Sequence, residues 1–369
     1  MNKKSFPNTT NALKYYHIKE ENVPIDVILT YIQYKKCAAL ANTYFKLYNK
    51  KIGESIVSVC DDIIKKKIYT DKVVVNLFES HTNLNMNINE IITYAVYKKF
   101  KLNIDPIKHV NLSQSSNDSF STVVHLISIK KAYELLSILK KCTIILKSKI
   151  KEFKNKPKIS KTHLRNAVKF SYDKEFRGFL ELIEYSIKLL KENIKKLGNI
   201  PAGLTMIGTG ENAPNNYSSV ITEILTKETK LELNATKNKY SIISSFNVIQ
   251  DFNQIMSILA SNLNKISYDI NLMVSDDESG KSLISIPRRS IGSSFMPQKN
   301  NPINCDQARM ISLKVNSNSN EITVANSMGN FQLNIYIPLV ANNTYQSAKL
   351  LMAGYSNFFE HCLKDVKLN

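Results

Sequence analysis

The amino-acid sequence predicts a mainly α-helical protein built from long packed helices, and two observations predict it. Apolar residues recur at steps of three and four along stretches that contain neither glycine nor proline, which is the pattern of one buried helix face. Alternation of apolar and polar residues, the pattern of a half-buried strand, is scarce. A chain of 369 residues is also long enough to bury a large core.

A long helix is expected between Pro106 and Pro157, because no glycine or proline interrupts this stretch. Its apolar positions are Leu126, Ile129, Tyr133, Leu136, Leu139, Leu146 and Ile150. The spacing places them along one side of a helix, so we expect all of them to be buried.

Further helices are expected over Tyr172 to Leu197, within Asn215 to Ser279, and over Ile303 to Met328. In the second of these the apolar positions are Ile249, Phe252, Ile255, Met256, Leu259, Leu263 and Ile266. Polar clusters occupy the breaks between the helices, at Pro157, Gly198 to Pro214, Gly280 to Pro302, and Gly329 to Pro338.

The composition is that of a globular protein, with 43% hydrophobic and 22% charged residues. No apolar run approaches the roughly 20 residues that span a bilayer, so no membrane association is expected. The five cysteines are scattered and lack metal-ligand spacing, which favours reduced thiols and a cytoplasmic location.

The formal net charge is +19. Lysine is spread over the whole chain, whereas a nucleic-acid-binding module concentrates its basic residues in a patch, so we expect no nucleic-acid partner. The excess positive charge still attracts small anions.

The stretch from Gly292 to Pro302, G-S-S-F-M-P-Q-K-N-N-P, is the most informative in the chain. Glycine and proline at its ends and centre predict a surface loop. The loop carries the hydroxyls of Ser293 and Ser294, the ammonium of Lys299 and the amides of two asparagines. Such donors suit a device that binds a carboxylate beside an activated serine.

Three other clusters are rich in hydroxyls, amides or imidazole: Ser80 to Glu90, Asn111 to Asp118, and Lys161 to His163. The second directly precedes the long helix predicted before Pro157, so Ser115, Ser116 and Asn117 are expected at a helix N-terminus, which favours an anion. Taken singly, such a run is more often a helix cap and a lone histidine is more often structural.

Taken together, these segments resemble the class II fumarases of the fumarase/aspartase superfamily, from about Pro7 to the end of the chain. The matching segments are Asn85 to Glu90, Ser113 to Asp118, Thr162-His163, Gly208-Thr209-Gly210 and Gly292 to Pro302. Aspartases carry glutamine in place of His163 and Ser-Thr-Asn in place of Ser115 to Asn117. Argininosuccinate lyase shares the Met-Pro-Gln-Lys wording but lacks the Ser113 to Asp118 segment.

The resemblance implies a fumarate hydratase that interconverts fumarate and (S)-malate in the tricarboxylic acid cycle. It implies Ser293 as the base that removes a proton, and His163 with Asp306 as the groups that bind and protonate the departing water. Aspartate stands at Asp306 where the family has glutamate. The substrate-binding residues that it implies are Ser80, Thr82, Ser115, Ser116, Asn117, Thr162, Lys299 and Asn301.

The resemblance further implies a homotetramer with a shared core of long helices, in which three subunits contribute to each active site. It implies a small dicarboxylate as the only ligand, with neither metal nor organic cofactor. The expected domains are an N-terminal helical domain over 1–112 and a long-helix domain over 113–369, with the small C-terminal domain of the family absent. An accessory carboxylate site is expected to be missing, since Asp105 to Lys108 replaces its usual residues.

Two other functions stay open on sequence alone. An aspartate ammonia-lyase would use the same fold to expel ammonia, and a catalytically silent helical scaffold would need neither Ser293 nor His163.

Overall fold

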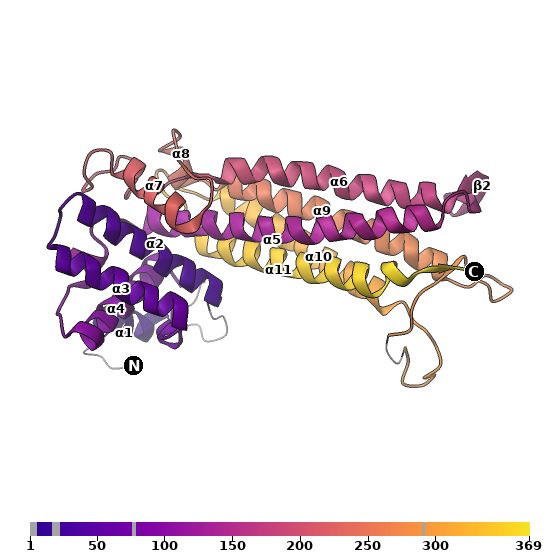
Figure 1. The fold of residues 1–369 in the computed structure, drawn as a ribbon, viewed down its shortest axis with the longest axis horizontal. Helices are drawn as coiled ribbons and strands as arrows, with labels where there is room; N and C mark the ends of the chain where they lie inside the picture. Colours follow the sequence, from indigo (N-terminus) through magenta and orange to yellow (C-terminus); the bar gives the residue numbers. More distant parts are fainter. Residues whose placement is uncertain (1–5, 17–22, 76–78, 290–291) are drawn as a thin grey trace. The chain divides into compact units, whose positions relative to one another are not determined.

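The computed structural model describes residues 6–16, 23–75, 79–289 and 292–369, and most of them are helical (Figure 1). They form two compact units. The first unit contains Met1–Lys130, Ile194–Gln250 and Glu321–Asn343, and the second contains Lys131–Asn193, Asp251–Asn320 and Thr344–Asn369. The mainly α-helical fold class is as expected from the sequence, whereas the domain boundary after residue 112 stays a prediction.

The first unit begins with four helices that pack on one another: α1 (Pro7–Tyr16), α2 (Ile25–Tyr44), α3 (Lys50–Lys66) and α4 (His81–Phe100). The N-terminus of α1 is held by the buried Glu90 carboxylate, which accepts hydrogen bonds from the backbone N–H groups of Asn8 (2.8 Å) and Thr9 (3.2 Å). A carboxylate at this end of a helix satisfies N–H groups that have no partner within the helix.

Shorter elements complete the first unit. They are the single turns η1 (Thr70–Lys72) and η2 (Pro106–Val110), the helices α7 (Tyr217–Thr229) and α8 (Ser241–Ser244), and the paired strands β3 (Asn199–Ile200) and β4 (Asn234–Ala235). The two strands are parallel. Helix α7 packs on α2 and on β4.

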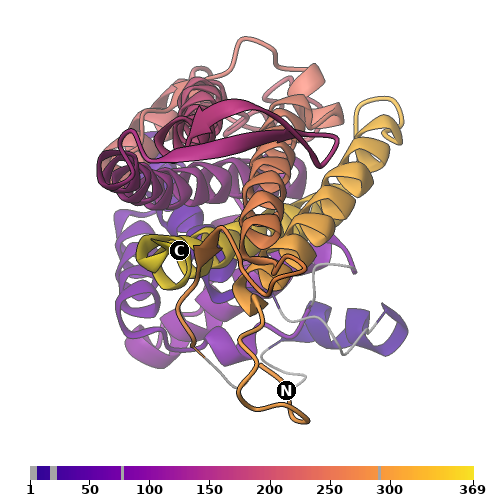
Figure 2. The same cartoon turned by 90° about the vertical axis from the view of Figure 1, so that its right-hand side faces the viewer.

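Long helices run side by side in the second unit (Figures 1 and 2). They are parts of α5 (Ser116–Glu152), α9 (Asn247–Val274), α10 (Ile303–Ser327) and α11 (Ile337–His361), and nearly all of α6 (Tyr172–Leu197). Gly354 allows close packing, because a Cβ atom there would lie 3.0 Å from Leu263 Cδ2 and 3.2 Å from Ile311 Cδ1. The Tyr355 hydroxyl donates to the carbonyl oxygen of Leu259 at 2.8 Å, so the interior phenol is satisfied.

Two short sheets and a final turn lie in the second unit. The strands are β1 (Pro157–Thr162) with β2 (Arg165–Ser171), and β5 (Ile284–Ser285) with β6 (Lys367–Leu368), each pair antiparallel. The turn η3 (Leu363–Asp365) precedes β6. The β1–β2 hairpin was not expected from the sequence.

The predicted helical stripes are confirmed with two exceptions, Tyr133 and Ile150, of which Ile150 is only partly buried. All seven apolar positions named on α9 are buried, and Leu126, Leu139 and Leu146 on α5 are fully buried. The predicted burial of Tyr133 is wrong, because its side chain is 44% exposed. The buried face passes through Ala132 and Leu135 instead, and the small alanine gave a weaker signal than the adjacent tyrosine.

The five cysteines are free and buried. In the described part of the chain, no helix is both long and apolar enough to cross a membrane. Within the same residues, no cluster of three or more His, Cys, Asp or Glu side chains is placed to hold a metal ion.

Candidate active site

The N-termini of α4 and α5 meet in the first unit and bring predicted site residues together. Ser80 caps α4, and its hydroxyl accepts a hydrogen bond from the Thr82 backbone N–H at 3.1 Å. The Thr82 hydroxyl lies 3.1 Å from the Ser116 hydroxyl in the first turn of α5. Ser115 caps the second helix, since its Oγ accepts from the Asn117 N–H at 3.2 Å. We call Ser80, Thr82, Ser115, Ser116 and Asn117 the helix-end cluster.

Both ends of the Asn117 amide are bonded. Its Nδ2 donates to the Met206 carbonyl oxygen at 2.8 Å, and its Oδ1 lies 3.1 Å from Nε2 of His81. An amide oxygen only accepts, so His81 must carry its proton on Nε2. Burial lowers the pKa of His81, which favours the neutral ring. The ring also stacks on Phe120, with the centroids 6.3 Å apart.

Asp118 fixes the start of α5 from inside. Its carboxylate is fully buried and accepts three backbone N–H groups, from Ser115 (2.9 Å), Gly203 (2.9 Å) and Thr205 (3.1 Å). Burial raises the pKa of Asp118 to about 7, opposed by those N–H donors and by the charge of Lys35. Since both carboxylate oxygens accept, the ionised form fits the geometry better.

Lys35 is the buried cation near Asp118. Its ammonium donates to the side-chain oxygens of Asn111 (3.1 Å) and Gln114 (2.9 Å), and burial lowers its pKa to about 7. Asn111 also accepts from Asn85, so this network reaches back to α4. The helix-end cluster is therefore supported by a hydrogen-bonded interior.

The turn that meets Asp118 needs glycine. Gly203 has φ +76, and a Cβ atom there would lie 2.8 Å from the Ser218 Cα. Thr205 also has a positive φ of 58. This left-handed backbone aims two N–H groups at one carboxylate oxygen, as in an anion-binding nest.

In the second unit, Thr162 and His163 lie at the tip of the β1–β2 hairpin. Thr162 pairs with Arg165, which leaves a two-residue turn of His163 (φ 50) and Leu164 (φ 62). Two positive φ values in a two-residue hairpin turn correspond to a type I′ turn. Both tip residues are exposed, so the imidazole is presented at the surface of the chain.

The hairpin base is tied to the chain that leads into the predicted loop. Lys158 forms an ion pair with Glu175 (2.8 Å) and lies over the Tyr172 ring at 5.4 Å. The Tyr172 hydroxyl donates to the Leu283 carbonyl oxygen at 3.2 Å. Leu283 immediately precedes β5, so this hydrogen bond joins the end of the hairpin to the segment that leads toward the loop.

Residues 292–302 form an exposed loop, as expected. Its ends touch, because Asn301 Nδ2 donates to the Gly292 carbonyl oxygen. A side chain at Gly292 is excluded, since a Cβ atom would lie 2.1 Å from the Lys299 carbonyl oxygen. The closure brings the residue next to Gly292, Ser293, close in the fold to the 299–301 segment.

Ser293 sits in an electrostatic setting that suits a base. Its Oγ accepts hydrogen bonds from the backbone N–H groups of Phe295 (3.2 Å) and Met296 (3.1 Å). Donors aimed at a hydroxyl oxygen stabilise its deprotonated form, as in an oxyanion hole. Two such donors on one serine favour an accessible alkoxide.

Arg288 adds a second cation to the loop. Its guanidinium donates to the Pro297 carbonyl oxygen and to Gln298 Oε1. Asp306 lies exposed in the first turn of α10. Within one chain, and among the described residues, no hydrogen bond or ion pair joins Asp306 to His163, so their pairing stays a prediction.

The structure therefore groups the predicted residues into three sets: the helix-end cluster, the hairpin tip with Thr162 and His163, and the loop with Ser293, Lys299 and Asn301. Sequence reasoning did not assign His81, Asp118 or Arg288. The first two stand inside quoted motifs, between or beside assigned residues. The only indication of Arg288 in the sequence is that it is one of two consecutive arginines ahead of the loop.

Comparisons with known proteins identify the family of the chain. The Lyase family matches residues 8–316. The class II fumarate hydratase of Helicobacter pylori (strain ATCC 700392 / 26695) is 31% identical over 370 aligned residues, covering 98% of this chain and 80% of the relative. That of Haemophilus ducreyi (strain 35000HP / ATCC 700724) is 32% identical, covering 95% of this chain and 77% of the relative.

The crystal structure of a class II fumarase from Schistosoma mansoni is similar to the whole fold, with a TM-score of 0.95 at 26% identity. The match covers 98% of this chain and 81% of that one. Since the family match spans most of the sequence and the relatives agree over nearly its full length, the chain belongs to the lyase family, among the class II fumarate hydratases.

Proposed function

We propose that the protein is a hydro-lyase that reversibly hydrates fumarate to (S)-malate. The observation that carries this proposal is the pair of backbone N–H donors on Ser293 Oγ, within a loop whose closure brings Lys299 and Asn301 near. The reaction is inferred from the related fumarate hydratases. The N–H donors of the loop give a physical reason why Ser293 can act as the base of that reaction.

In the direction from malate, the Ser293 alkoxide removes a proton from the carbon next to one carboxylate. The electron pair of that C–H bond moves into the carboxylate and gives an aci-carboxylate dianion. The Lys299 ammonium and the Asn301 amide stabilise the added charge. Charge that develops in the transition state gains more from fixed donors than the ground-state carboxylate does, which is how these groups accelerate the step.

In the second step the C–O bond of the neighbouring carbon breaks and the electron pair forms the C=C bond of fumarate. His163 protonates the departing hydroxide to water, with Thr162 beside it. Asp306 orients the imidazole and stabilises its charged form. The helix-end cluster holds the other carboxylate, because two helix N-termini supply hydroxyl, amide and backbone donors there.

The complete site is assembled from three subunits of a homotetramer. Surface composition supports an assembly: Met310 and Leu313 on α10 are 64% and 73% exposed, and Leu164 and Val168 on the hairpin are 62% and 69% exposed. Large apolar side chains grouped on a surface mark interaction sites. The enzyme acts on a small dicarboxylate in the tricarboxylic acid cycle, in the cytoplasm, and without a cofactor.

The test is an assay of the purified protein with malate and with aspartate, following the ultraviolet absorbance of fumarate. Hydration chemistry predicts fumarate from malate and none from aspartate. If fumarate forms from aspartate and not from malate, the proposal is wrong and the protein is an ammonia-lyase. If a folded oligomer forms fumarate from neither substrate, the protein is a catalytically silent scaffold.

A further inference from the structure

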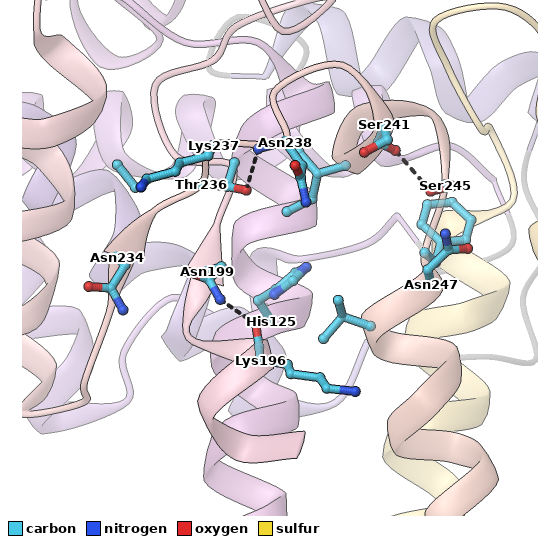
Figure 3. A pocket seen from close by; sticks show the side chains of 14 residues that line it. His125, Lys196, Asn199, Asn234, Thr236, Lys237, Asn238, Ser241, Ser245 and Asn247 are labelled. Atoms are coloured by element: carbon cyan, nitrogen blue, oxygen red, sulfur yellow. Dashed lines mark hydrogen bonds between the residues drawn. The ribbon is translucent and has the colours of Figure 1, made fainter. Parts of the chain in front are cut away.

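The first unit contains a cavity of about 760 Å³ that none of the predicted site residues lines (Figure 3). It lies where β3 and β4 pair, beneath the segment 236–248. A cavity of this volume accommodates a small organic ligand. The pairing that forms it is tight, since a Cβ atom at Gly198 would lie 2.5 Å from the Glu232 carbonyl oxygen.

His125 forms the floor of this cavity and is only 2% exposed. Its Nδ1 lies 2.9 Å from the Leu197 carbonyl oxygen. A carbonyl oxygen only accepts, so Nδ1 carries the proton and Nε2 presents a lone pair. Among the described residues, no partner is found for Nε2. Burial lowers the pKa of His125 to about 4, which keeps the ring neutral near pH 7.

A neutral imidazole with a free lone pair accepts a hydrogen bond and repels an anion placed directly against it. The floor therefore selects a ligand group that donates, such as a hydroxyl. His125 Nε2 is not among the buried side-chain atoms that lack a partner, so a ligand hydroxyl would take the place of water on this acceptor.

The rim has a different character. Lys196 and Lys237 supply positive charge, and Asn199, Asn238 and Asn247 supply amides (Figure 3). The lining residues in the described part of the chain include no aspartate or glutamate. The ammonium of Lys237, with the amides beside it, favours an anion at the mouth. Serine hydroxyls at 241 and 245 add further hydrogen-bonding groups.

From the donor-selecting floor and the cationic rim, we propose that this cavity is a binding site for a small hydroxylated anion, of the sugar phosphate or hydroxycarboxylate class. The ligand places a hydroxyl against His125 Nε2 and its anionic group near Lys237. The site does not depend on the hydratase activity, because none of its lining residues belongs to the helix-end cluster, the hairpin tip or the loop.

The binding test uses isothermal titration calorimetry on the full chain with four probes. D-Glucose 6-phosphate and D-gluconate carry both hydroxyls and an anion, D-glucose carries hydroxyls only, and sulfate carries the anion only. At least one of the first two is expected to bind more tightly than both glucose and sulfate, and which one binds distinguishes a phosphate ligand from a carboxylate ligand.

Two matched substitutions locate the bound probe. Lys237→Gln removes a rim cation, whereas Lys239→Gln removes another exposed cation two residues away that does not line the cavity. The first is expected to weaken binding by about fivefold, as loss of one net polar contact predicts, and the second to leave it unchanged.

His125→Asn tests the floor, because an asparagine amide can replace the Nδ1 donation to Leu197 but offers nothing at the position of Nε2. It is expected to weaken the bound probe by roughly fivefold, with similar thermal stability. If this variant does not fold, the two lysine variants decide the question. The proposal is overturned if neither hydroxylated anion binds more tightly than glucose and sulfate, or if Lys239→Gln weakens binding as much as Lys237→Gln.

Discussion

At the scale of the residue, Ser293 is the hydroxyl that we propose as the base. A serine alkoxide is unstable in water, and the loop counters this with two backbone N–H donors at 3.2 and 3.1 Å from Oγ. Lys299 lies in this loop and Arg288, ahead of it, donates to the Pro297 carbonyl oxygen, so two cations nearby also favour negative charge. The neighbouring Ser294 is exposed and is not bonded in this way within the described residues.

The pair Ser293→Ala and Ser294→Ala tests this distinction. Ser293→Ala removes the proposed base, and its kcat for malate is expected to fall by about 10³-fold, as general-base catalysis predicts. Ser294→Ala should retain activity within about twofold. Steady-state kinetics on both variants check this, and comparable losses in the two would contradict the assignment.

His125 makes a pH prediction that is independent of the active site. Its pKa in the fold, about 4, lies below its ordinary value of 6.5, so the unfolded chain binds more protons in between. The contribution to stability is complete above pH 6.5 and is lost as the pH falls toward 4. Between pH 7 and pH 5 this amounts to roughly 2 kcal/mol.

Urea unfolding at pH 7 and at pH 5 tests this contribution of His125 to stability. His125→Asn should lose less stability than the unmodified protein on going from pH 7 to pH 5, by that same amount. Identical losses in both proteins would show that the histidine is not the group responsible.

At the scale of the element, Asp118 joins the start of α5 to the 203–205 turn. Its two oxygens accept N–H groups from both segments, so this carboxylate fixes the start of α5, where Ser115 and Asn117 lie. The same turn accepts from Asn117 through the Met206 carbonyl oxygen. One buried side chain thus sets the relative position of two loops.

Asp118→Asn replaces one acceptor oxygen with a donor that faces a backbone N–H group. The free energy of unfolding is expected to fall by about 3 kcal/mol, because a buried network is left partly unsatisfied. KM for malate should rise as well, since the helix-end cluster loses its support. The matched control is Asp105→Asn, at the partly exposed cap of η2, with an expected loss below about 1 kcal/mol because asparagine caps a helix about as well as aspartate does. Equal losses, measured by urea unfolding, would contradict this role.

The long helices could be predicted because burial imposes their period on the sequence. On α9, every position that the sequence predicted to be buried is buried. On α5, the prediction for Tyr133 is wrong, because the buried position beside it is Ala132, whose small side chain adds little to a hydrophobic pattern. The hairpin could not be predicted, since its strands are largely exposed and have no alternating pattern. Its turn also lacks the Asn-Gly type of signal and uses His163 and Leu164 with positive φ instead.

The candidate site residues could be named from the sequence where local motifs carry hydroxyls, amides and cations, as in the loop and at the helix ends, and their roles stay predictions. The supporting residues could not be named, because Asp118, His81 and the 203–205 turn act through contacts between segments far apart in the sequence. Spacing along the chain does not encode such contacts.

At the scale of the whole molecule, the exposed apolar side chains of α10 are expected to lie between protomers. Leu313→Glu places a charge in that interface, so size-exclusion chromatography with light scattering should show species smaller than a tetramer. Lys188→Gln, on the exposed face of α6, changes the charge by the same amount and should leave the tetramer intact. An unchanged mass for Leu313→Glu would place the interface elsewhere.

The most direct test of the composite active site mixes two inactive variants, Ser293→Ala and His163→Asn, in co-expressed tetramers. If each site takes its serine and its imidazole from different protomers, random mixing leaves about a quarter of the sites with both groups intact, and hydratase activity recovers to that level. If one protomer supplies both groups, no site is intact, and activity no higher than that of the separate variants would contradict the account.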